Sequence, residues 1–156
     1  MYKLINIFLS LVVFFTVSCS DSSTNTSDSS PDYFEVFIDG QKWTADNTLQ
    51  AVMLYDNLKI TARKTDSLKG NERIEITFKS PTNGKTGVFV SNPVMGDWVT
   101  YQNDNIAPLM QVSKSGNYTI TNYTSNSIEG TFSFSADKIT ESGTSEFTSG
   151  KFKVKF

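Results

Sequence analysis

Apolar and polar residues alternate with a period of two along most of the chain after residue 32. Phe34, Val36 and Ile38 fall on one side of such a pattern, and residues 73–79 repeat it as RIEITFK. Because successive side chains of a β-strand point to opposite faces of a sheet, this period predicts half-buried strands. No stretch in this region shows apolar residues at helical spacing over three turns, so we expect an all-β domain.

Turn signals separate these apolar stretches. Asp39-Gly40 is typical of a type I′ hairpin turn, which needs positive φ at both central positions, and Asp56-Asn57 is a second turn pair. Roughly eight to ten short strands with turn signals every 8–12 residues predict an antiparallel β-sandwich or a closed barrel over residues 33–156. The expected core residues are Phe34, Val36, Ile38, Trp43, Ile60, Ile74, Ile76, Phe78, Tyr118, Ile120, Ile128, Phe132, Phe134, Phe152, Val154 and Phe156.

The first 32 residues have a different character. Lys3 precedes an almost wholly apolar run at residues 4–17, which is shorter than a transmembrane helix and has the length of a signal h-region. Thr16-Val17-Ser18-Cys19 resembles a bacterial lipobox, so we expect a lipoprotein signal peptide over residues 1–18 and acylation of the Cys19 thiol. The alternatives are an ordinary signal peptide cut elsewhere and an uncleaved anchor.

Residues 19–32 are rich in Ser, Thr and Asp, which predicts a flexible tether behind the lipidated Cys19. The membrane is then a partner through the lipid anchor, because two or more acyl chains give stable attachment. We expect the protein at the outer membrane of a bacterial cell envelope. The sequence leaves open whether it faces the periplasm or the outside.

Composition excludes several classes of function. The formal net charge is −2, so the chain lacks the basic excess with which proteins bind nucleic acid. It contains no His and one Cys, which removes the commonest general base, the commonest metal ligand and any intrachain disulfide. We therefore expect a protein that is not an enzyme and that needs no cofactor. Asn103-Asp104-Asn105 offers oxygen ligands but lacks the spacing of a calcium loop, so no metal site is predicted.

One segment suggests a ligand-binding site. Trp98 and Tyr101 lie close in sequence to Asn103 and Asp104. Aromatic rings beside amides and carboxylates can hold a sugar by stacking and hydrogen bonding. The alternative is a Trp that packs on the core, followed by a polar loop.

Two further features concern the surface. Asp66-Ser67-Leu68 resembles a short signal for O-glycosylation in Bacteroidetes, which would modify Ser67. Lys151, Lys153 and Lys155 alternate with apolar residues at the C-terminal end. They fit either a site for an anionic ligand or a solvated strand face that guards a sheet edge.

Three stretches together resemble a known family. They are residues 34–45 (FEVFIDGQKWTA), 128–134 (IEGTFSF) and 148–156 (TSGKFKVKF). In this order after a lipobox they resemble uncharacterised Bacteroidetes lipoproteins that carry a domain of unknown function. The resemblance implies an all-β envelope domain and brings no catalytic residue with it.

These observations favour a non-catalytic binding module anchored to the membrane, with a glycan or an envelope protein as its ligand. The first alternative is a structural or accessory subunit that docks on an outer-membrane protein complex through a sheet edge or an apolar patch. The second is an unrecognised hydrolase, which would need a cluster of carboxylates in a cleft.

Overall fold

A computed structural model describes residues 30–46, 48–66, 70–92, 94–104, 110–138 and 142–156. These residues form ten strands and no helix, and every strand pairing is antiparallel. The prediction of an all-β antiparallel fold is therefore confirmed. The strands are β1 Tyr33–Ile38, β2 Gln41–Thr44, β3 Leu49–Leu54, β4 Asn57–Asp66, β5 Gly70–Lys79, β6 Thr86–Val88, β7 Trp98–Asn103, β8 Met110–Tyr123, β9 Ser127–Asp137 and β10 Thr144–Lys155.

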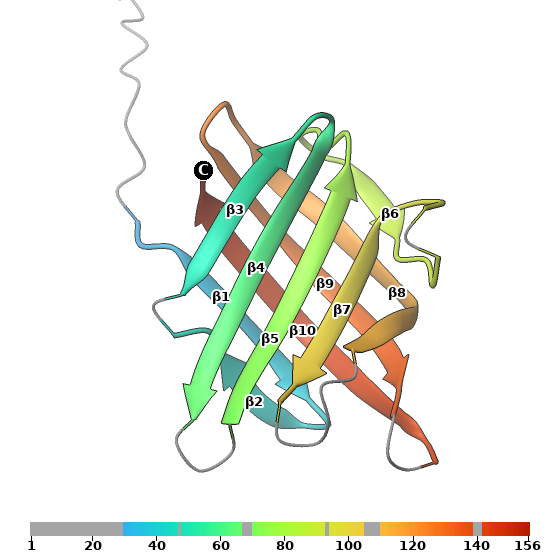
Figure 1. Ribbon diagram of the computed structural model, residues 1–156. Coiled ribbons are helices and arrows are strands. Elements are labelled where there is room, and N and C mark those ends of the chain that lie inside the picture. The colour runs from blue at the N-terminus through green and yellow to red at the C-terminus, as the bar shows by residue number, and fades with distance from the viewer. Residues whose placement is uncertain (1–29, 47, 67–69, 93, 105–109, 139–141) are drawn as a thin grey trace, which may run out of the picture.

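One curled sheet forms a half-barrel with two layers (Figure 1). The strand order is β2-β1-β10-β9-β8-β7-β5-β4-β3, and β6 pairs with β8 off this path. The strands β3, β4, β5 and β7 form the front layer of Figure 1, and β1, β10 and β9 cross behind them. The two terminal strands, β2 and β3, do not pair with each other in the described part of the chain, so the sheet stays open between them.

Strand β8 joins the two layers. Its first residues pair with β7, where Thr100 lies opposite Val112, and its later residues pair with β9, where Tyr118 lies opposite Phe132. The chain thus passes from one layer to the other inside a single 14-residue strand. Strands β8, β9 and β10 are longer than the short strands that the apolar pattern predicts, because polar residues flank their apolar centres.

The hairpin turns agree only in part with the sequence. The prediction at Asp39-Gly40 is confirmed, with φ values of 48° and 81°. The prediction at Asp56-Asn57 is wrong by one residue: Leu54 pairs with Asn57, and the turn consists of Tyr55 and Asp56. The predicted turn and the observed turn both leave Leu58 and the alternate residues after it on the same face of the sheet. The apolar period therefore does not show which of the two turns is correct.

Aromatic rings fill the space between the layers. The ring centroids of Phe78 on β5 and Phe152 on β10 are 5.7 Å apart, and those of Phe34 and Phe132 are 5.1 Å apart. All the expected core residues are buried except Ile38 and Phe156, which pack on the core while partly exposed. The pattern did not single out seven further core residues: Leu58, Ala62, Phe89, Val99, Tyr101, Ala136 and Phe147.

Candidate functional site

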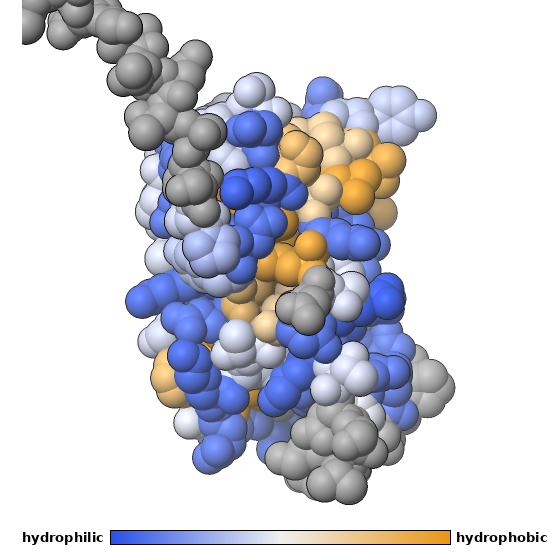
Figure 2. Space-filling view, turned by 90° about the vertical axis from the view of Figure 1, so that its left-hand side faces the viewer, coloured by the Kyte–Doolittle hydropathy of each residue, from blue (hydrophilic) through white to orange (hydrophobic). Residues whose placement is uncertain are grey.

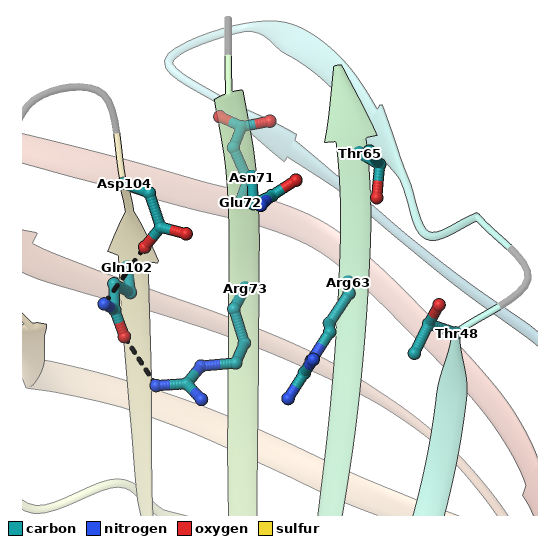
Figure 3. Close-up of a pocket in the computed structure, with 8 residues that line it drawn as sticks. All are labelled: Thr48, Arg63, Thr65, Asn71, Glu72, Arg73, Gln102 and Asp104. Carbon is teal, nitrogen blue, oxygen red and sulfur yellow. Dashed lines mark hydrogen bonds between the residues drawn. The ribbon is translucent and has the colours of Figure 1, made fainter. Parts of the chain in front are cut away.

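The candidate site is a hollow of about 290 Å³ at one end of the front layer (Figure 3). Its volume lies just below the usual range for small-molecule sites, about 300–1,000 Å³. Every residue that lines it is polar or charged, which favours a polar ligand over an apolar one. The lining residues are Thr48, Arg63, Thr65, Asn71, Glu72, Arg73, Gln102 and Asp104.

Two arginines occupy the floor of this hollow. Arg63 on β4 lies directly opposite Arg73 on β5, and Arg73 lies directly opposite Gln102 on β7. Their neighbours Ala62, Ile74 and Tyr101 are buried, so strand alternation places the arginines on the outer face of the sheet. Figure 3 shows the two arginine side chains next to each other and pointing the same way.

The two arginines differ in their partners. The Arg73 guanidinium donates a hydrogen bond of 2.5 Å to Gln102 Oε1 and lies 3.8 Å from Glu75 Oε1. In the part of the chain that the structure describes, the Arg63 guanidinium has no hydrogen-bond or ion-pair partner. Like charges directly opposite each other destabilise a sheet, and an anion bound between them would remove that repulsion.

Glu72 forms the inner border of the hollow. Its Oε2 accepts a hydrogen bond of 2.8 Å from Trp43 Nε1, and its Oε1 accepts one of 2.7 Å from the Tyr101 hydroxyl. Asn103 Nδ2 donates a third, of 3.3 Å. Burial raises the pKa of Tyr101 well above its usual value, and the bond to Glu72 raises it further. Glu72 therefore ties β5 to β2 and β7 through three hydrogen bonds.

The structure separates the residues of the predicted sugar site. Trp98 and Tyr101 lie on opposite faces of β7, since they are three positions apart along the strand. Tyr101 is 6% exposed, and its ring packs on Phe147 with the centroids 5.2 Å apart. The two rings are not brought together as one stacking surface, whereas Trp98 is half-buried and on the same face as Gln102.

Asn103 and Asp104 also lie on different faces of the front layer. Asn103 faces the interior and contacts Glu72, whereas Asp104 borders the hollow and accepts a hydrogen bond of 3.1 Å from Gln102 Nε2. Of the predicted site residues, Asp104 lines the hollow itself, and Trp98 lies farther along the same outer face. The other two predicted residues, Cys19 and Ser67, lie outside the described residues.

The C-terminal lysines do not form a continuous charged face. Lys153 is 6% exposed and bonds to Ser30, whereas Lys151 and Lys155 are exposed. Strand β10 has neighbours on both sides, β1 and β9, so these lysines do not guard a sheet edge.

Sequence reasoning missed the arginine pair. The alternation in RIEITFK places Arg73 on the polar face of its strand, but the sequence gives no sign that Arg63 lies opposite it. That pairing depends on the register of β4 against β5, which neither strand shows by itself.

The structure thus defines an all-β protein built on one curled antiparallel sheet, with a polar hollow on the outer face of its front layer. Residues 30–154 match the model of the family "Domain of unknown function (DUF6252)", and the chain belongs to this family. Searches of curated proteins and of solved structures found no match. Among the described residues, no helix is long and apolar enough to cross a membrane.

Proposed function

We propose that this protein is a non-catalytic binding module whose hollow holds an anionic carbohydrate, one that carries a carboxylate or a sulfate. The observation that carries the proposal is the cross-strand pair of Arg63 and Arg73 in a hollow with an entirely polar lining. Arginine offers a planar fork of donors that fits carboxylate and other oxyanions. The hydroxyl of Thr65 and the amides of Asn71 and Gln102 supply further groups for sugar hydroxyls.

A longer ligand would continue along the outer face of β7. Trp98, Thr100 and Gln102 share that face, and Trp98 is about 13 Å from Gln102 along the strand, at about 3.3 Å per residue. The half-buried Trp98 ring would then stack on a sugar one or two units away from the acidic group. This arrangement keeps Trp98 as a binding residue and leaves Tyr101 in the core.

The binding test compares acidic and neutral oligosaccharides of equal length. The full-length protein in detergent is titrated with a galacturonate trisaccharide, a sulfated galactose trisaccharide and a neutral galactose trisaccharide, and heat of binding is measured. We expect binding of at least one acidic sugar and at least ten-fold weaker binding in Arg63→Gln, a change of about 1.4 kcal/mol. Trp98→Ala should weaken binding of the acidic trisaccharide and leave binding of a single acidic sugar unchanged.

Lys114→Gln is the matched control. Lys114 is an exposed lysine on β8, paired with Asp137 at 3.1 Å, so the variant makes the same change of charge away from the hollow. Equal binding of acidic and neutral sugars, equal losses in Arg63→Gln and Lys114→Gln, or no binding of either acidic sugar would each refute the proposed site.

We further propose that the protein is a lipoprotein of a bacterial outer membrane, of the kind found in Bacteroidetes, anchored through Cys19. The support is the apolar leader that ends at the single Cys of the chain, followed by a polar tether. Cells grown with radiolabelled palmitate should label the wild-type protein and not Cys19→Ser. Equal labelling of the two proteins would exclude Cys19 as the site, and Ser23→Thr in the polar tether serves as the control.

A specific observation also favours the alternative of an accessory subunit. Strand β3 presents an unprotected sheet edge with exposed apolar side chains, which is the kind of surface on which protein partners dock.

A further inference from the structure

The two terminal strands of the sheet differ in how their edges are protected. Strand β2 has four residues, and its Lys42 forms an ion pair with Glu35 at 2.8 Å. Strand β3 has six residues, LQAVML, with no charge and no proline. Native edges are usually blunted by short length, charge, proline or a bulge. Strand β3 has none of these devices, so its edge is suited to pair with another strand.

The register of the β3–β4 hairpin shows which backbone groups this edge offers. The Arg63 N–H donates to the Thr48 carbonyl at 3.2 Å, which fixes Thr48 and the alternate residues after it as the positions bonded to β4. The N–H and C=O groups of Leu49, Ala51 and Met53 then point away from β4. Among the described residues, β4 is the only strand that pairs with β3.

The side chains along this edge are exposed and apolar. Val52, Met53 and Leu54 are 49%, 37% and 56% exposed. Figure 2 faces the side of the molecule on which β3 lies in Figure 1, and it shows hydrophobic surface gathered there. A partner strand would therefore gain apolar contacts in addition to backbone hydrogen bonds.

We propose that the partner is a second copy of this chain, paired through β3 in antiparallel register about a two-fold axis at Ala51. Ala51 then lies opposite Ala51 of the second copy, Leu49 opposite Met53, and Gln50 opposite Val52. This register aligns all the outward backbone groups of the edge in both directions, as an interface of two identical patches requires.

The sequence of β3 favours this self-pairing. In the proposed register no charged side chain faces another, so the repulsion that like charges cause in a strand pair is absent. On the outer face Val52 and Leu54 of each copy extend the apolar surface across the axis. Arg63 and Arg73 lie on β4 and β5, away from this edge, so the pairing does not depend on the anion site.

Cysteine crosslinking tests the register directly. Gln50 and Val52 of opposite copies would form a non-hydrogen-bonded pair with Cα atoms about 4.5 Å apart, which a disulfide can span. Oxidised full-length Gln50→Cys/Val52→Cys in detergent should run as a crosslinked dimer on a non-reducing gel. Either single variant puts its two cysteines on a diagonal of about 7–8 Å, so each should stay at the wild-type background set by Cys19.

Light scattering of the full-length protein in detergent tests the dimer without crosslinking. We expect a concentration-dependent dimer, and at least ten-fold weaker association in Val52→Lys, since an edge lysine opposes pairing. Val88→Lys is the control, because Val88 is 65% exposed on the short strand β6.

The crosslinking and light-scattering results together decide whether two copies pair through β3. Crosslinking that is confined to the double variant, together with a dimer that Val52→Lys weakens and Val88→Lys does not, supports pairing through β3. A monomer at every concentration, a dimer that the double variant fails to crosslink, or equal crosslinking in the single and double variants overturns it.

Discussion

Two glycines inside strands explain part of the packing at the scale of single residues. A Cβ added to Gly150 on β10 would lie 2.5 Å from ring atoms of Phe132, and one added to Gly130 on β9 would lie 2.5 Å from the Thr119 carbonyl oxygen. Each glycine therefore admits a neighbouring ring or backbone that a side chain would displace. Both lie within stretches on which the family resemblance rests.

We expect Gly150→Ala to destabilise the protein by about 1–3 kcal/mol, because the added methyl overpacks the core at Phe132. Denaturant unfolding of wild type and variant measures the difference in the free energy of unfolding. Thr131→Ala, at an exposed position of β9, is the control and should stay within about 0.5 kcal/mol of wild type. If Gly150→Ala were as stable as the control, the close packing of Phe132 on Gly150 would be wrong.

The same scale shows the limit of prediction for the site. Asp104 lines the hollow and Trp98 lies on the same face, so two of the four residues of the predicted sugar site fall on the outer face of the front layer. Proximity in sequence does not show which face of a strand a residue lies on. Because the segment after Trp98 is polar, the sequence did not show whether Tyr101 faces the core or the solvent. The sequence could not predict that Arg63 and Arg73 lie side by side, because they are neighbours only through strand pairing.

At the scale of elements, periodicity identifies the strands and most of their buried faces. It does not give the strand order, since β1 pairs with β10 at the far end of the chain as well as with its neighbour β2. The pattern also does not show whether the turn between β3 and β4 consists of Tyr55-Asp56 or of Asp56-Asn57. Long-range pairing depends on which apolar faces fit together, and a single sequence does not encode that as a local signal.

The corner between the two layers depends on one carboxylate. Asp46, just before β3, accepts hydrogen bonds from the backbone N–H groups of Thr48 at 3.0 Å and Thr65 at 2.8 Å. These bonds lower the pKa of Asp46. The corner holds the start of β3 against β4 and so fixes which residues of β3 are hydrogen-bonded to β4. The other residues of β3 direct their backbone N–H and C=O groups outward from the sheet edge.

At the scale of the whole molecule, each end of the half-barrel carries a buried tyrosine bonded to a carboxylate. Tyr101 on β7 donates to Glu72 on β5, and Tyr118 on β8 donates to Asp97 in the loop before β7. Lys85 Nζ lies 3.4 Å from the same Asp97 carboxylate. These bonds connect separate elements, so their loss weakens the fold as a unit.

The two tyrosines predict a loss of stability at alkaline pH. Burial raises the pKa of both, and the bonds to Glu72 and Asp97 raise it further. The unfolded chain releases these protons near pH 10, before the folded chain does. The stabilising contribution is therefore complete below about pH 10 and decreases as the pH rises above it. Denaturant midpoints between pH 8 and pH 11.5 measure this loss.

The double variant Tyr101→Phe/Tyr118→Phe isolates the tyrosine contribution from that of the lysines, which titrate in the same range. It should be less stable than wild type at pH 8, because each of the two carboxylates loses one hydrogen-bond donor, and its stability should fall less between pH 8 and pH 11.5. Tyr55→Phe is the control, since the Tyr55 side chain is 98% exposed and its loss should leave the wild-type profile unchanged. If the double variant and the wild type lost the same stability over this range, the buried tyrosines would not be its cause, and the lysines of the outer faces would account for it.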